Sequence, residues 1–93
     1  MNECDIVVGS VVLSKQGRDK GSFFLVTAVD AKGFVYLADG GMRKLNAPKK
    51  KNVKHVSYSG VDLPAIAEKL RQGKKVFDSE VKSALRQLNR QEL

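Results

Sequence analysis

Residues 11–29 read VVLSKQGRDKGSFFLVTAV, and this stretch decides the fold. Apolar residues at alternate positions enter a short polar segment, which Gly17 and Gly21 bracket, and leave it again on the far side. The pattern predicts two strands joined by a tight loop. The loop carries Arg18 and Lys20 where glycines let a partner approach, and N–H groups of such turns can bind phosphate oxygens. Taken alone, the same residues are more often a plain hairpin whose charges face water.

Outward from this hairpin, short runs rich in Val, Phe and Tyr are separated by Gly, Asp, Asn and Lys. This alternation of apolar runs and turn residues predicts several short strands with tight connections. Five strands this short indicate a mainly β fold closed into a small barrel, because an open sheet would leave its outer strands unprotected. The expected strands are Val8–Ser14, Phe23–Asp30, Phe34–Ala38, a weak one near Met42–Leu45, and Val53–Tyr58.

After Gly60 the apolar spacing changes to that of a helix. Asp62 is the expected N-cap of a first helix, Pro64 fits its first turn, and Gly73 supplies its end. A second helix is expected to start after Asp78. The C-terminal third is therefore predicted to be one or two helices.

Two of the expected strands contain runs that are apolar throughout, at residues 23–26 and 34–37. A strand with one solvated face alternates apolar and polar residues, so something must cover the outer side of these two. We expect the C-terminal helices to do so. The chain is thus predicted to be a single integrated domain, with residues 1–60 as the barrel and 61–93 as a helical extension packed on it.

Charge gives the first indication of function. The chain has 17 Lys and Arg against 10 Asp and Glu, a net charge of +7, which favours polyanionic partners such as nucleic acid. Six cations lie within residues 43–54, and Pro48 and Asn52 in this segment predict a protruding loop. Cations at this density favour a polyanion site over a merely solvated loop.

The composition argues against an enzyme. His55 and Cys4 are the sole residues of their types, Cys4 lies near the N-terminus, and His55 lies among lysines. A Cys–His nucleophile pair needs the two in contact with a third orienting group, and a zinc site needs three or four ligands. Phosphate-binding and dinucleotide-binding glycine motifs are absent from the sequence. We expect no catalytic residue, cofactor or metal.

The apolar runs and the single cysteine also bear on location. One cysteine permits no intramolecular disulfide, and no apolar run reaches the length of a membrane span. Acidic Glu3 and Asp5 stand where a signal peptide would carry positive charge. A cytoplasmic location is therefore expected, with no membrane partner.

The aromatic residues could in principle stack on unpaired bases. Phe23, Phe24, Phe34 and Phe77 have apolar sequence neighbours and are expected in the core instead. Tyr36 and Tyr58 are also expected in the core, because aromatic side chains are so often buried.

The spacing through Gly17, Lys20 and Gly21 resembles a KOW motif, the strand–loop–strand unit of ribosomal proteins and transcription elongation factors. The string from Val12 to Gly21 is similar to one branch of these, the SH3-like large-subunit ribosomal proteins of archaea and eukaryotes with their short bacterial relatives. Residues 38–40, 43–44 and 48–55 continue the match, so the resemblance covers about residues 7–58. It implies a five-stranded SH3-like barrel whose loops contact RNA. The implied RNA contacts are Lys15, Gly17, Arg18, Lys20, Gly21, Arg43, Lys44, Lys49, Lys50, Lys51, Lys54 and His55.

Together these observations predict a non-enzymatic RNA-binding protein that is associated with the ribosome and binds ribosomal RNA, as a stable component or as a translation-associated factor. Recognition is expected to depend on RNA shape and phosphate position more than on base identity. The main alternative is a protein–protein interaction module of a transcription or translation factor, and the C-terminal helices could hold such a partner. Binding of double-stranded DNA is a weaker third alternative.

Overall fold

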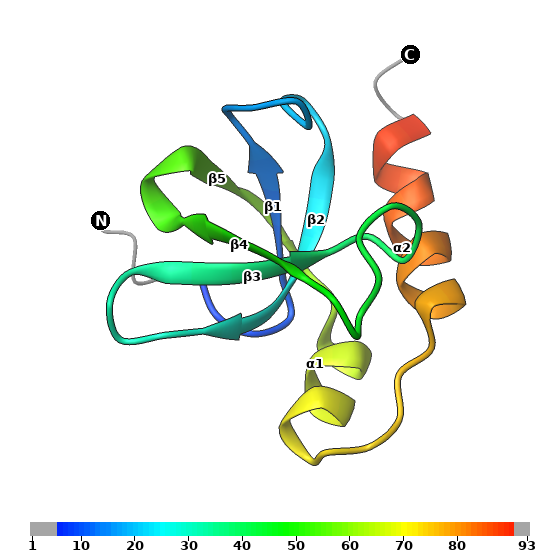
Figure 1. Cartoon of the computed structure of the whole chain (residues 1–93). Helices are drawn as coiled ribbons and strands as arrows, with labels where there is room; N and C mark the ends of the chain where they lie inside the picture. The colour runs from blue at the N-terminus through cyan, green and yellow to red at the C-terminus, as the bar shows by residue number, and fades with distance from the viewer. Residues whose placement is uncertain (1–5, 91–93) are drawn as a thin grey trace.

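The computed structural model describes residues 6–90, which form five strands followed by two α-helices (Figure 1). Three of the strands lie close to the predicted ranges, because each is a short apolar run between turn segments, which is a local signal in the sequence. The fold is therefore mainly β with a helical appendage, as predicted. The elements are β1 (Ser10–Ser14), β2 (Phe23–Val29), β3 (Phe34–Ala38), β4 (Lys49–Asn52), a 3₁₀ turn η2 (Val53–His55), β5 (Val56–Asp62), α1 (Pro64–Arg71) and α2 (Asp78–Arg90).

The five strands form one antiparallel sheet in the order β4-β3-β2-β1-β5. Strands β4 and β5 stand at the two ends of this order, and η2 connects them along the chain. The first strand is internal: Val11 lies opposite Leu25 of β2 on one side and opposite Val61 of β5 on the other. Irregular register occurs beside Val11/Val12 and between Val26 and Ala28.

The fourth strand differs from the prediction. The weak strand expected near Met42–Leu45 is wrong, and so is the protruding lysine loop, because Lys49–Asn52 form β4 and pair with β3. Residues 39–47 instead turn tightly, since Oδ1 of Asp39 accepts hydrogen bonds from the backbone N–H groups of Gly41 and Arg43, both at 2.9 Å. These bonds hold the segment away from an extended conformation.

Each face of the sheet carries its own apolar cluster. The inner cluster contains Ile6, Val12, Phe24, Val26, Val35, Leu37 and Val56. The outer cluster joins Val11 and Leu25 of the sheet to Ile66 of α1 and to Val81 and Leu85 of α2. The two helices therefore lie on the outer side of β1 and β2, which explains why residues 23–26 are apolar throughout.

Strand β3 is not covered in this way. No β3 residue belongs to the outer cluster as described for residues 6–90, and both Phe34 and Tyr36 are half-buried. The ammonium of Lys50 lies 4.6 Å from the centre of the Phe34 ring, so a lysine partly shields this face instead of a helix. Core placement is also wrong for Phe77, which precedes α2 and is 56% exposed.

The helix boundaries follow the predicted signals in part. Pro64 occupies the first turn of α1, and the helix stops at Arg71 before Gly73, whose φ of 73° suits a glycine. Asp62 does not cap the helix: Leu63 is the N-cap, without a side-chain hydrogen bond, and Asp62 accepts a bond from the Tyr58 hydroxyl at 2.9 Å. Within residues 6–90, neither helix is long and apolar enough to cross a membrane.

Candidate nucleic-acid interface

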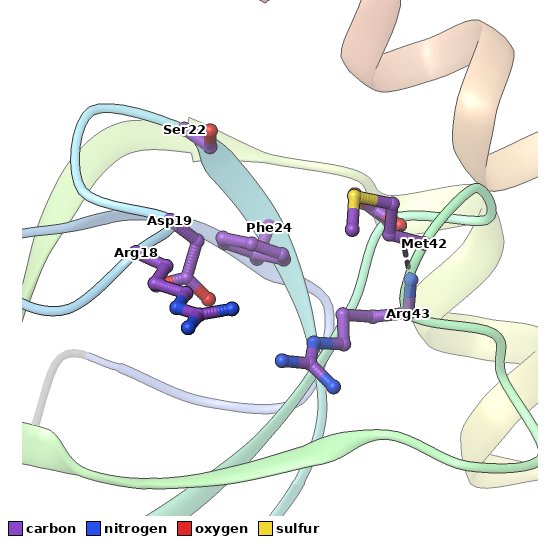
Figure 2. A pocket seen from close by; sticks show the side chains of 7 residues that line it. Arg18, Asp19, Ser22, Phe24, Met42 and Arg43 are labelled. Carbon is purple, nitrogen blue, oxygen red and sulfur yellow. Dashed lines mark hydrogen bonds between the residues drawn. The ribbon is translucent and has the colours of Figure 1, made fainter.

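Two loops far apart in the sequence meet at one end of the sheet. The β1–β2 loop (residues 15–22) and the β3–β4 loop (residues 39–48) leave the sheet at the same end, because Leu13 pairs with Phe23 and Leu37 pairs with Lys49. Between them lies a hollow of about 250 Å³ (Figure 2). Its lining residues come from both loops and from β2, and they are Arg18, Asp19, Ser22, Phe24, Asp39, Met42 and Arg43.

The β1–β2 loop is a tight turn held by its own backbone. Gly17 and Gly21 have φ values of 91° and 90°, a conformation that other residues adopt at a cost. Gly21 donates its N–H to the Ser14 carbonyl at 2.9 Å, and Lys20 and Ser22 donate to Gly17 and Asp19 at 3.2 and 3.1 Å. These three N–H groups are occupied internally, so they are not available to a phosphate.

Lys51 holds the same loop from the inside of the sheet. It lies opposite Val35 of the inner cluster, is 8% exposed, and is the one buried lysine among the described residues. Its ammonium donates to Ser14 Oγ at 2.8 Å, to the Gln16 carbonyl at 2.7 Å and to Asp19 Oδ1 at 3.0 Å. An ammonium has three donors, and all three are used here. Lys51 is thus a structural residue that anchors the β1–β2 loop, with no donor left for an external phosphate.

The carboxylate of Asp19 completes this network. Its side chain is 16% exposed, and Lys49 approaches its Oδ2 at 3.5 Å. Burial acts to raise the pKa of Asp19, but the hydrogen bond and charge of Lys51, a backbone hydrogen bond and the charge of Lys49 together hold that pKa below its usual 3.8. The carboxylate is therefore kept ionised and committed to the two lysines.

The β3–β4 loop is supported from outside by α2. The backbone N–H of Leu45 donates to Asp78 Oδ1 at 2.7 Å. Gly40, with φ of 79°, packs so closely that a Cβ there would collide with the carbonyl oxygen of Asp78 and lie 2.9 Å from the backbone nitrogen of Lys82. The C-terminal helix thereby fixes the loop that carries Arg43.

Two guanidinium groups face each other across the hollow. Figure 2 shows Arg18 and Arg43 approaching from opposite sides, with Phe24 between them and Met42 above. Within residues 6–90, neither arginine takes part in an ion pair. Phe24 is 2% exposed and closes the hollow from the inner cluster, whereas Met42 is 90% exposed at its rim.

The other residues implied by the KOW resemblance are distributed unevenly. Lys15 is exposed, and its N–H donates to the His55 carbonyl at 2.9 Å, which places half-buried His55 and exposed Lys54 beside the β1–β2 loop. Exposed Lys20 and Lys44 lie on the two loops themselves. Lys50 instead points to the outer face, over Phe34.

Part of the hollow could not be assigned to a site from the sequence: Met42 was expected in a weak strand, and Asp19 and Asp39 had no expected role. Phe24 lies in the core as expected and also lines the hollow. The glycine-rich turn around Met42 was the available signal, because a large apolar residue within such a turn has no strand or helix to bury it.

Within the described residues, no group of three His, Cys, Asp or Glu side chains is placed to hold a metal ion. Cys4 lies outside the described residues. Comparison of the sequence with models of known protein families and with curated proteins gives no match.

Proposed function

We propose that the chain is a non-enzymatic RNA-binding protein of the KOW type, built on an SH3-like barrel, and that it binds ribosomal RNA. The observation that carries the proposal is the pair of unpartnered guanidinium groups, Arg18 and Arg43, at the end of the sheet where two loops converge. Arginine presents a planar fork of donors that matches phosphate oxygens. A pair without carboxylate partners is therefore well suited to a polyanion.

The surroundings support the same proposal. Exposed lysines lie on both loops and on η2, and these are Lys15, Lys20, Lys44 and Lys54. Acidic side chains of the same loops are engaged internally, since Asp19 binds Lys51 and Asp39 binds backbone N–H groups. The net field at this end is thus positive, which attracts phosphates and guides their approach.

The sheet also supports the SH3-like assignment. Its order places β1 between β2 and β5, and the sheet curls so that Lys51 of β4 reaches Ser14 at the end of β1. β4 and β1 are not paired through their backbones, and the side-chain hydrogen bonds of Lys51 connect them instead. In this arrangement the loops, rather than a flat strand surface, present the charges.

The test compares two variants that each lose three positive charges. Arg18→Ser/Lys20→Ser/Lys44→Ser removes exposed cations of the two loops, and Lys32→Ser/Lys74→Ser/Arg86→Ser removes exposed cations elsewhere. Binding to ribosomal RNA is measured by fluorescence anisotropy over a salt series. The slope of log affinity against log salt is negative, and each phosphate contact contributes about 0.7–0.9 to its magnitude. Since three cations are removed, we expect the magnitude of the slope to be about two units smaller in the loop variant.

The control variant is expected to keep nearly the wild-type slope, and both variants are expected to keep their thermal midpoints because the replaced side chains are exposed. Equal losses in the two variants would contradict a localised site. Absence of binding to ribosomal RNA at low salt would refute the proposed function. Competition with DNA duplex of matched sequence separates RNA from DNA binding, since A-form shape and the 2′-OH differ.

A protein-binding role is the second candidate, and one observation favours it. At the opposite end of the sheet, a hollow of about 440 Å³ is lined mainly by apolar residues, including Ile6, Val35 and Val53, with Val29 46% exposed at its side. If a protein partner binds at this end, Val29→Ser would lower the affinity for that partner and leave the affinity for RNA unchanged. The loop variant above would do the reverse.

A further inference from the structure

Met42 has an unusual position for a large apolar side chain. It is 90% exposed, the highest exposure among the large apolar residues described, and it stands at the rim of a hollow flanked by two arginines. Exposure of an apolar thioether side chain to water is unfavourable. A methionine held at this position by a tight turn is therefore suited to contact the apolar face of a ligand.

The size of the hollow limits what can enter. Its volume of about 250 Å³ lies below the range of about 300–1,000 Å³ that is usual for pockets binding drug-sized ligands. One planar ring system fits such a space, and a folded strand or helix does not. Phe24 supplies an apolar inner wall, and Met42 lines the hollow on the same side as Arg43 (Figure 2).

The charges around the hollow divide it into two parts. Asp19 and Asp39 line it, and their carboxylates disfavour a phosphate placed among them. Both backbone hydrogen bonds to Asp39 go to Oδ1, so its Oδ2 can accept a hydrogen bond from an N–H group of a base. The guanidinium groups of Arg18 and Arg43 have no ion-pair partner within residues 6–90 and favour a phosphate. A single nucleotide carries both kinds of group.

We propose that this hollow receives one unpaired nucleotide of a structured RNA, with its base against Met42 and Phe24 and its phosphate between Arg18 and Arg43. The inference rests on the proposed RNA-binding function and adds the kind of RNA element that is recognised. Unpaired bases in bulges and loops can be splayed out of the helix and contacted by apolar side chains and arginine planes, whereas paired bases cannot.

The experiment uses two RNA hairpins that are identical except for one unpaired adenosine in the stem of one of them. We expect wild-type protein to bind the bulged hairpin about five- to tenfold more tightly. This corresponds to the lower end of the ~1–3 kcal/mol that a stacked base contributes, because Phe24 is almost wholly buried and Met42 is not aromatic. Met42→Ser should bind both hairpins equally, at the affinity of the paired one. Met42→Leu, which keeps an apolar side chain, should retain most of the preference.

A second measurement reports the base directly. The unpaired adenosine is replaced by 2-aminopurine, whose fluorescence depends on its stacking. Wild-type protein and Met42→Leu should change that fluorescence on binding, and Met42→Ser should change it much less. The same probe placed at a paired position serves as the reference.

The outcomes separate this inference from the function on which it rests. Equal binding of both hairpins by wild-type protein, with normal affinity, would overturn the nucleotide site and leave RNA binding in place. Preference for the bulged hairpin that persists in Met42→Ser would place the base elsewhere and would also overturn the inference. Failure to bind either hairpin or ribosomal RNA at low salt would overturn both proposals.

Discussion

Arg18 and Asp19 are neighbours in the chain, yet they belong to two opposite kinds of charge cluster. Asp19 joins the interior network, in which every donor of the Lys51 ammonium meets an oxygen. Arg18 faces Arg43 across the open hollow, and neither makes an ion pair within residues 6–90. The number of cations in a segment therefore does not reveal the role of that segment. Whether each cation already has a partner within the fold distinguishes a structural lysine from a cation that is available to an external anion.

The largest expected effect follows from removing the interior cation. Lys51→Met keeps the length of the side chain and removes its charge. Asp19 then retains one ion pair, the 3.5 Å contact with Lys49, and a hydrogen bond from Ser14 Oγ at 3.3 Å. We expect the free energy of unfolding to fall by about 3 kcal/mol, since breaking a buried ion pair leaves the other charge poorly solvated. Urea unfolding followed by circular dichroism measures this change.

Its matched control is Lys50→Met, one residue away on the exposed outer face. This variant loses a contact with the Phe34 ring and is expected to change the free energy of unfolding by less than about 1 kcal/mol. Similar losses in the two variants would contradict the contrast between interior and surface lysines.

The next effect concerns the contact with α2 that holds the β3–β4 loop, which carries Arg43, in place. Gly40→Ala combines an unfavourable φ with a collision against the backbone of α2, and we expect about 2 kcal/mol of destabilisation together with weaker RNA binding, because the loop carrying Arg43 must shift. Gly33→Ala is the control, since it has a similar φ of 93° but open space around the added Cβ. It should lose about 1 kcal/mol and keep its RNA affinity. Thermal unfolding and anisotropy measure the two quantities.

The smallest effect is a change in pH dependence. The pKa of Asp19 is lowered in the folded protein, so its contribution to stability is present above about pH 4 and is lost as the pH falls through the lower folded value. Asp30 and Glu80, whose pKa values are lowered mainly by hydrogen bonds, act in the same direction. The thermal midpoint of the wild type should therefore decline on the acid side.

Variants of the two clusters should differ in this acid decline. Lys51→Met removes the ammonium whose hydrogen bond and charge contribute most to lowering the pKa of Asp19. The thermal midpoint of this variant should therefore fall less steeply below about pH 4 than that of the wild type. Arg18→Ser/Arg43→Ser should follow the wild-type curve, because neither arginine contributes to that shift. Identical acid declines in all three proteins would show that Asp19 is not coupled to Lys51.

Much of the sheet could be predicted from the sequence. The bounds of Phe34–Ala38 agree with the prediction, because an apolar run between two turn segments is a local signal. Strand β4 could not be found in this way. Its three consecutive lysines have poor strand propensity, and Lys51 is tolerated inside the sheet because oxygens of Ser14, Gln16 and Asp19 come from more than thirty residues away.

The candidate site divides along the same line. Arg18 and Arg43 were identified as cations from the sequence, but their placement on opposite sides of one hollow depends on the pairing of β2 with β3. Asp62 is not the helix cap, because β5 continues to Asp62 and leaves Leu63 at the N-cap position, while the Asp62 carboxylate accepts a hydrogen bond from the Tyr58 hydroxyl. Phe77 follows apolar Val76 in the sequence, yet it lies in the connection before α2, where it is 56% exposed beside Lys75.

The position of β1 inside the sheet has a consequence for the order of folding. Its partner β2 follows after a short loop, but its partner β5 is made about fifty residues later, as the pairing of Val11 with Val61 shows. Closing so long a segment is entropically costly and slow compared with forming the β1–β2 and β2–β3 hairpins. During synthesis the hairpins can therefore form early, while the second flank of β1 stays open until Asp62 has left the ribosome. The two helices can then pack on a completed sheet. Because α2 holds the β3–β4 loop through Asp78, that loop reaches its final arrangement only when the last third of the chain has docked.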